Sequence, residues 1–391
     1  MPGLSPLPSR LISPEPRSPL KRFRLFSLTF SGGHPIPMAT TKCAPNGQAL
    51  ASMDAILHAT PGNPVPGHPT VGFFNGHRGI QLRYAVFRSD SPEIKGTVVL
   101  LHGRNETIEK YFETIRDLTS RGYWVATYDF RGQGGSQRLL KDPRKGHINR
   151  FNDYVRDLEI FLEQVVLPDT RLPFFVLAHS TGGLIALKAA PRLSNRIERM
   201  VLTAPFVGLG GQKASPENIY RLSRLASWTG LGHICLNRDE PRKDFDDNPL
   251  TSDPTRFARN QRLVIDHPEL FLGPPTARWL YEAQKTINQV RDPRHLASIT
   301  VPTVIIAPGN DPIVPFLYQE KLSQYFRAGQ LVPVPGSRHE ILHEHDRYRT
   351  QALAAFFAFV PGGEPDEVRE TQRLTDADMP NAGMSDADIE I

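Results

Sequence analysis

Short runs of apolar residues alternate with longer amphipathic segments through the middle of the chain. Five of these runs are almost continuously apolar, and they cover residues 97–101, 124–128, 174–177, 200–203 and 303–306. Short apolar runs without polar alternation are typical of strands that are covered on both faces, as they are in parallel sheets. The pattern therefore predicts five buried, parallel strands.

The segments between these runs carry apolar residues at spacings of three and four, as helices do. The clearest of them begins near Asn149, and its apolar positions are Phe151, Tyr154, Val155, Leu158, Phe161, Leu162 and Val165. This spacing places one apolar stripe along one side of a helix. Alternation of buried strands with such helices predicts a doubly wound, mostly parallel α/β sheet.

The alternation of apolar runs with helical segments stops between Pro205 and about His295, and it resumes at Val301. The interval contains helical patterns and many turn residues but no convincing strand. An inserted helical cap explains it most economically. We therefore expect an α/β core built from residues 53–205 and 296–360, with a helical cap at residues 206–295.

The two ends of the chain differ from the middle. Residues 1–37 hold eight of the 36 prolines without sustained periodicity, and residues 361–391 carry nine acidic residues. Such segments bury too little apolar surface to offset the entropy of ordering. We expect residues 1–52 to be a disordered extension, or one that precedes a true start at Met38 or Met53, and residues 361–391 to be a flexible acidic tail.

Composition narrows the class of protein. A content of 39% hydrophobic and 22% charged residues is typical of a soluble globular protein. Cys43 and Cys235 are too few for a disulfide framework, so a cytoplasmic location is expected. The basic residues behind the net charge of +5 are scattered, which favours an ordinary solvated surface and predicts no nucleic-acid partner. Transient contact with an anionic membrane surface is the alternative for a chain whose middle is basic.

Candidate chemistry begins where the run at residues 174–177 ends. This run leads into Ala178-His179-Ser180-Thr181-Gly182-Gly183, and a helix-forming segment follows at residues 184–189. A strand, a serine among small residues and a helix form a nucleophile elbow, a sharp turn that lifts the serine hydroxyl above the sheet edge. Ala178 stands where the motif more often has glycine. Ser180 is therefore the candidate nucleophile, and an ordinary surface turn is the alternative.

A serine nucleophile needs a base and an acid that orients the base. Asp311 follows the run at residues 303–306, and His339 follows a shorter apolar segment at residues 331–334. The order serine, aspartate, histidine, with each residue after a strand, is the order found in α/β folds that assemble a hydrolytic triad. We predict that Ser180, Asp311 and His339 are catalytic.

Two backbone amides are candidates for stabilising a developing oxyanion. Arg104 lies just beyond His102-Gly103 after the first buried run, and Thr181 begins the helix after the serine. His102 is expected to brace the loop.

Apolar cap residues are candidates for the wall of an acyl tunnel, although such residues in helices more often belong simply to the core. The candidates are Trp228, Trp279, Tyr281, Leu280 and Phe271.

Two further motifs indicate other chemistry. His339 to His343 spell HExxH, the pattern of a zinc protease, which requires a long helix. Because His339 follows Gly336 closely, we expect it in a loop or a first helical turn, with His343 and His345 as exposed helix residues. The segment at residues 132–136 resembles a phosphate loop but lacks the third glycine and the lysine, so residues 129–136 are expected to form a tight structural turn.

Several motifs together resemble the serine-hydrolase family of lysophospholipases and monoacylglycerol lipases. They lie at residues 102–107, 110–111, 129–134, 146–155, 178–183, 248–253 and 339–342, within a span of residues 75–360. The resemblance implies an α/β-hydrolase with Ser180 as nucleophile, Asp311 as acid and His339 as base. It implies a single-chain lipid ester as substrate, and no metal or organic cofactor is expected. Thr181 stands where methionine is common in the family, which bears on the shape of the acyl pocket.

Three other functions remain as alternatives. A peptidase of the proline aminopeptidase type has the same fold, and it would need an acidic pocket for a free amine. A zinc metalloprotease would use HExxH at residues 339–343. A catalytically inactive fold used for binding is the third alternative, and the presence of all three triad positions argues against it.

Overall fold

The computed structural model describes residues 55–212, 214–236 and 244–362. All of them belong to one compact unit, Met53–Ile391. The expectations for residues 1–52, for Met38, Met53 and Cys43, and for the acidic tail beyond residue 362 lie outside the described residues.

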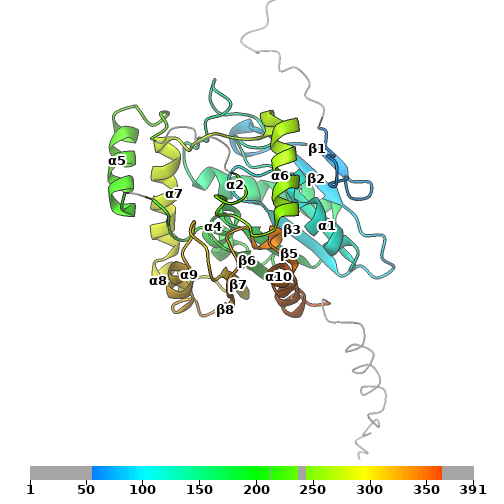
Figure 1. Ribbon diagram of the computed structural model, residues 1–391. Coiled ribbons are helices and arrows are strands. Elements are labelled where there is room, and N and C mark those ends of the chain that lie inside the picture. The colour runs from blue at the N-terminus through cyan, green and yellow to red at the C-terminus, as the bar shows by residue number, and fades with distance from the viewer. Residues whose placement is uncertain (1–54, 213, 237–243, 363–391) are drawn as a thin grey trace, which may run out of the picture. The chain divides into compact units, whose positions relative to one another are not determined.

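An eight-stranded sheet with the strand order β1-β2-β4-β3-β5-β6-β7-β8 runs through this unit (Figure 1). Its strands are β1 (Thr70–Asn75), β2 (Gln81–Phe87), β3 (Gly96–Leu101), β4 (Tyr123–Tyr128), β5 (Phe174–His179), β6 (Arg199–Thr203), β7 (Thr303–Pro308) and β8 (Gly329–Val334). β2 is antiparallel to both of its neighbours, and the pairs from β4 to β8 are parallel. The predicted mostly parallel α/β sheet is confirmed.

The five apolar runs became β3 to β7. Every residue of β3, β5 and β7 is buried, as expected for strands covered on both faces. The sequence pattern did not reveal β1 and β2. In β1 only Phe74 is buried, because β1 is the edge strand and most of its residues are partly open to solvent.

Two hydrophobic clusters cover the two faces of the sheet. Val99 and Leu101 belong to one cluster, and their neighbours Val98 and Leu100 belong to the other. Since successive side chains of a strand point to opposite faces, the clusters lie on opposite sides. The first cluster contains residues of α2 (Asn152–Phe161) and α4 (Thr181–Ala189), and the second contains residues of α1 (Phe112–Thr119) and α10 (Asp346–Phe359).

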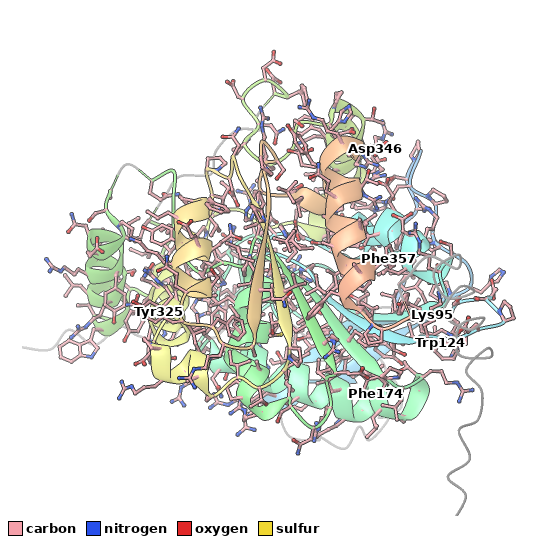
Figure 2. All side chains as sticks on the ribbon, turned by 90° about the horizontal axis from the view of Figure 1, so that it is seen from below. Lys95, Trp124, Phe174, Tyr325, Asp346 and Phe357 are labelled. Atoms are coloured by element: carbon pink, nitrogen blue, oxygen red, sulfur yellow. The ribbon has the colours of Figure 1, made fainter. Side chains whose placement is uncertain are left out.

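The helices that flank the sheet form where the sequence predicts helices with one apolar side. The segment predicted from Asn149 forms α2, which continues through a π-helical turn at Leu162–Val166 into α3 (Leu167–Asp169). α10, labelled at Asp346 and Phe357, runs along the sheet in Figure 2. Its Phe356 packs edge-on against Tyr123 of β4. The remaining core helix is α9 (Phe316–Ser323), and short 3-10 turns lie at His77–Gly79, Ile108–Tyr111, Ala190–Arg192, Pro268–Leu270 and Ile341–His343.

The segment expected to form a cap is helical. It holds α5 (Pro216–Trp228), α6 (Pro254–Asp266), α7 (Ala277–Val290) and α8 (Pro293–Ala297), and its described residues form no strand. Ala283, Ile287 and Val290 of α7 join the same hydrophobic cluster as Leu184 of α4, so α7 packs on the core while α5 lies outside it (Figure 1). The proposed cap limits at residues 206 and 295 remain a prediction.

The described helices include none that is long and apolar enough to cross a membrane.

Candidate active site

Ser180 lies in the sharp turn between β5 and α4. Its backbone has a φ of 50° and a ψ of −113°, a conformation that non-glycine residues seldom adopt. Three hydrogen bonds hold it: its N–H donates to Thr203 O at 3.0 Å, and its carbonyl accepts from Leu184 and Phe206 at 3.1 and 2.9 Å. This is the geometry of a nucleophile elbow.

The small residues around Ser180 are required by close packing. A Cβ atom on Gly182 would lie 2.7 Å from His102 O, and one on Gly183 would lie 2.8 Å from Pro205 Cβ. Ala178 is fully buried, so the methyl group that replaces the usual glycine hydrogen is accommodated. The elbow therefore brings β5 and α4 against the loop that follows β3.

Ser180, His339 and Asp311 are brought together by the fold. His339 Nε2 lies 3.0 Å from Ser180 Oγ, and His339 Nδ1 lies 2.7 Å from Asp311 Oδ2. The other carboxylate oxygen of Asp311 accepts from the N–H groups of Ile313 and Val314 at 2.8 and 2.9 Å. This network assigns the ring proton to Nδ1 and leaves Nε2 as the acceptor for the serine hydroxyl.

The loops that carry Asp311 and His339 are bonded to each other. Gly309 N–H donates to Val334 O at 3.0 Å, and Asn310 N–H donates to Ser337 O at 2.9 Å. Glu340 N–H donates to Leu250 O at 2.9 Å, so the cap segment also anchors the histidine loop. These bonds limit the movement of the imidazole relative to the carboxylate.

Arg104 and Thr181 both line the cavity beside Ser180. Among the described residues, neither of their N–H groups donates to another protein group.

His102 braces the loop as expected: its Nδ1–H donates to Gly103 O at 2.6 Å, and its Nε2 accepts from Phe130 N–H at 3.2 Å. Complete burial lowers the pKa of His102, which keeps the ring neutral.

A buried charge cluster beneath the site was not found from the sequence. Lys110 Nζ lies 2.6 Å from Glu106 Oε1 and 2.6 Å from Glu340 Oε1. Glu106 also accepts from Gly103 N–H and, at 2.7 Å, from Tyr111 OH. Lys110 thus links the loop of Arg104 to the residue after His339. The spacing of four between Glu106 and Lys110 was the available signal. Glu106 precedes the 3-10 turn Ile108–Tyr111, so the pair forms across a loop and not along one helical face.

The charges of this cluster shift each other's pKa values. Burial alone would lower the pKa of Lys110, but Glu106 and Glu340 outweigh it and raise that pKa. Burial alone would raise the pKa of Glu106, but the charge of Lys110 and its hydrogen bond hold that pKa well below its usual range. Burial raises the pKa of Glu340 despite Lys110. Lys110 therefore carries its charge, and Glu106 is its main counter-ion.

His179 lies next to His339 but does not compete with it as a base. The two ring centres are 5.0 Å apart, and His179 Nδ1 lies 3.1 Å from Thr203 O. Burial lowers the pKa of His179 to about 3. A ring this hard to protonate holds its place by hydrogen bonding and does not accept a proton at neutral pH.

The HExxH residues do not share one long helix. His339 lies in a loop, as expected, and both of its ring nitrogens are engaged by Asp311 and Ser180. The expectation that His343 is an exposed helix residue was wrong: it is 1% exposed at the end of the 3-10 turn Ile341–His343 and packs edge-on against Tyr111. His345 is exposed, as expected, and caps α10.

The segment at residues 129–136 forms the structural turn that was expected. Asp129 accepts from the N–H groups of Ile108 and Gly135 at 3.1 and 2.8 Å and pairs with Arg83 at 2.6 Å. Gly134 has a φ of +52°, which glycine adopts without strain.

A cavity of about 500 Å³ opens above Ser180. The large apolar side chains of its wall are those of Phe206, Leu209, Ile219, Leu222, Leu236, Leu250, Trp279, Leu280 and Ile313. Trp279 and Leu280 thus line it, as expected. Trp228 was a wrong candidate: it is 91% exposed at the end of α5 and lies outside this wall, as do Tyr281 and Phe271. α5 presents Ile219 and Leu222 to the cavity instead.

Comparison with known proteins places the chain in a family. Residues 92–346 match the profile of the family described as serine aminopeptidase, S33. The chain is 31% identical over 299 residues to lysophospholipase L2 of Escherichia coli, with 73% of this chain and 86% of that protein covered. It is 29% identical over 289 residues to a probable lysophospholipase L2 of Haemophilus influenzae, with 74% of this chain and 91% of that protein covered.

Two solved structures have the same fold. A soluble variant of monoglyceride lipase from Saccharomyces cerevisiae superposes with a TM-score of 0.62 at 20% identity, covering 77% of this chain and 99% of that one. The monoacylglycerol lipase of Paleococcus ferrophilus superposes with a TM-score of 0.58 at 20% identity, covering 72% of this chain and 99% of that one. The chain therefore belongs to the serine aminopeptidase S33 family and is a hydrolase with the α/β-hydrolase fold.

Proposed function

We propose that this hydrolase cleaves the carboxylic ester of a single-chain lipid, such as a lysophospholipid or a monoacylglycerol, through an acyl-enzyme on Ser180. The observation that carries the proposal is the pair of contacts at 3.0 and 2.7 Å that join Ser180, His339 and Asp311 beneath a largely apolar cavity. The names of the relatives, lysophospholipase and monoglyceride lipase, support the same substrate class.

In the proposed reaction His339 Nε2 takes the proton of Ser180 as Oγ attacks the acyl carbonyl carbon. The N–H groups of Arg104 and Thr181 stabilise the tetrahedral oxyanion, and each such donor is worth about 3 kcal/mol. His339 then protonates the leaving alcohol oxygen, and water cleaves the acyl-enzyme by the same steps. Asp311 keeps the imidazole oriented and stabilises its cationic form.

The charges of the cavity favour an ester over a peptide with a free amine. An aminopeptidase needs a carboxylate that is free to pair with the substrate amine. Glu106 and Glu340 are the carboxylates among the described residues that line the cavity, and Lys110 lies 2.6 Å from each of them. We therefore expect aminoacyl anilides to be turned over far more slowly than acyl esters of similar size.

A chelator distinguishes a zinc metalloprotease from the proposed serine hydrolase. Both ring nitrogens of His339 are engaged by the triad partners, so the proposed chemistry does not use HExxH as a metal site. Treatment with 1,10-phenanthroline should leave ester hydrolysis intact. Loss of activity that returns with added zinc would contradict the proposed function.

Labelling with a fluorophosphonate tests the nucleophile. We expect intact-mass spectrometry to show one covalent adduct on the wild type and none on Ser180→Ala, with Ser120→Ala, a change at an exposed serine, as the matched control. Circular dichroism should show that both variants are folded. Labelling of a folded Ser180→Ala protein at another residue would refute the assignment.

A further inference from the structure

Arg104 is a residue of the cavity wall, and its side chain carries a positive charge beside Trp279. Arg104 lines the cavity together with Ser180 and Trp279, and its guanidinium carbon lies 5.4 Å from the Trp279 ring centre. Its Nη2 donates to Gly273 O at 2.5 Å. The residue whose N–H faces the proposed oxyanion therefore also places a cation near the substrate.

This cation lacks a counter-ion. Among the described residues no carboxylate pairs with Arg104, and its Nε–H is buried without an acceptor. Arginines that are buried in the described part of the chain are paired: Arg83 with Asp129 and Glu109, and Arg131 with Asp157. Arg138 is partly buried, as Arg104 is, and no described carboxylate pairs with it, but it lies outside the cavity. A partly buried charge without a partner carries a desolvation cost, and an anion bound in the cavity beside Arg104 would offset it.

Arg104 remains charged under ordinary conditions. Burial lowers its pKa to about 10, which still leaves the guanidinium protonated at neutral pH. The two carboxylates of the cavity wall are both bonded by Lys110 and do not neutralise Arg104. An incoming anion would therefore meet an uncompensated positive charge.

We infer that Arg104 binds the phosphate of the substrate, so that the enzyme prefers a lysophospholipid to a neutral monoacylglycerol. The inference rests on the proposed function and deepens it. A guanidinium matches the oxygens of phosphate with paired N–H donors, whereas glycerol hydroxyls offer no charge. Within Arg104, the length of one side chain separates the backbone N–H from the guanidinium. Within a lysophospholipid, the glycerol carbons separate the acyl carbonyl from the phosphate by a comparable length.

Substrate discrimination tests this inference. We would measure kcat/KM for lauroyl lysophosphatidylglycerol and for monolauroylglycerol, both as monomers in solution, with wild type, Arg104→Met and Arg104→Lys. The ratio of the two values should fall about tenfold or more in Arg104→Met, mainly through KM of the phosphate substrate, as expected for a lost hydrogen bond to a charged group. Arg104→Lys, which keeps a cation, should retain more of the ratio.

The matched control is Arg138→Met, which removes a partly buried arginine that does not line the cavity. The ratio should stay at its wild-type value in this variant. An equal loss for both substrates in Arg104→Met would show that Arg104 only supports the loop, and this would overturn the inference. A wild type that hydrolyses neither ester would refute the proposed function itself, and the inference would fall with it.

A second measurement does not depend on the folding of any variant. Glycerol 3-phosphate should inhibit wild-type hydrolysis of monolauroylglycerol competitively, and glycerol should not. Inorganic phosphate should inhibit more weakly than glycerol 3-phosphate, because it lacks the glycerol contacts. Equal inhibition by both anions would indicate a site for free phosphate, and no inhibition by either would indicate no phosphate site; either result contradicts the inference.

Discussion

Lys110 and Glu340 form a buried ion pair, with 2.6 Å between Nζ and Oε1, that joins the loop of Arg104 to the loop of His339. Lys110 makes an equally short contact with Glu106, whose carboxylate accepts the N–H of Gly103. One lysine therefore connects the loop of Arg104, a proposed oxyanion donor, to the loop of the proposed base.

Replacement of this lysine should damage both stability and catalysis. Lys110→Met leaves two buried carboxylates without their cation, so we expect the free energy of unfolding to fall by about 3–5 kcal/mol. The value of kcat should fall as well, because the loop at Gly103 loses its anchor. Urea unfolding and steady-state kinetics measure the two effects. Lys321→Met, at an exposed position, should change stability by less than about 0.5 kcal/mol, and equal effects of the two changes would contradict the prediction.

Asp311→Asn should abolish most of the activity without unfolding the protein. The amide no longer accepts the Nδ1–H of His339, so the imidazole is left in the wrong tautomer to take the serine proton. We expect kcat to fall by roughly 10⁴-fold, as in other triads. Asp169→Asn, at an exposed aspartate, is the control and should keep wild-type kcat. A loss below about tenfold in a folded Asp311→Asn protein, compared with the usual triad effect, would show that this carboxylate does not orient the base.

The apolar wall of the cavity should determine the preference for acyl chains. Ile219 lines the cavity, so Ile219→Ser should lower kcat/KM for a decanoyl ester by roughly fivefold, equivalent to about 1 kcal/mol of apolar contact, and affect an acetyl ester less. Trp228→Ser, on the same helix but outside the cavity, should not change the preference. Turnover of acetyl esters by the wild type that matches or exceeds turnover of decanoyl esters would contradict this account.

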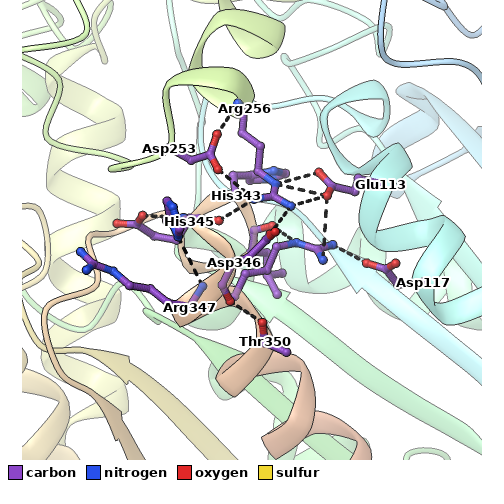
Figure 3. Close-up of polar contacts among 12 residues, drawn as sticks. Glu113, Asp117, Asp253, Arg256, His343, His345, Asp346, Arg347 and Thr350 are labelled. Carbon is purple, nitrogen blue, oxygen red and sulfur yellow. Dashed lines mark hydrogen bonds and ion pairs between the residues drawn. The ribbon is translucent and has the colours of Figure 1, made fainter.

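The ion pairs of Figure 3 should make the stability of the folded protein depend on pH in the acid range. Arg256 of α6 pairs with Glu113 of α1 at 2.6 Å and with Asp346 of α10 at 2.7 Å, so it ties the cap segment to the core. Partial burial alone would raise the pKa of Glu113, but the hydrogen bond from Arg256 and the charges of Arg349 and Arg259 lower it to about 2.

A carboxyl whose folded pKa is depressed stabilises the protein above its unfolded pKa, and this stabilisation is lost as the pH falls through the folded value. Thermal unfolding should therefore show that Glu113→Gln is less stable than wild type at neutral pH. The difference should shrink between pH 4.5 and about 2. Glu217→Gln, at an exposed position, should track the wild type throughout. A difference that stays constant over this range would refute the role of the Glu113 charge.

Local patterns were sufficient for the central strands and for the proposed triad. Buried strands leave apolar runs in the sequence whichever partners they have, and the turn at Ser180 leaves small residues next to it. Asp311 and His339 were predictable because each directly follows a strand, and the ends of parallel strands meet at one sheet edge. The edge strand β1 left a weaker signal because most of its side chains are not fully buried.

Tertiary contacts decided the features that no local pattern encodes. Trp228 and Ile219 lie on one amphipathic helix, and only the packing of α5 determines which of them faces the cavity. His343 is buried because Tyr111, more than 200 residues earlier in the chain, lies against it. The pairing of Lys110 with Glu340 and the lack of a counter-ion at Arg104 arise in the same way. Hydrophobic periodicity reflects burial within a segment, whereas charge pairing and cavity shape depend on which distant segments meet.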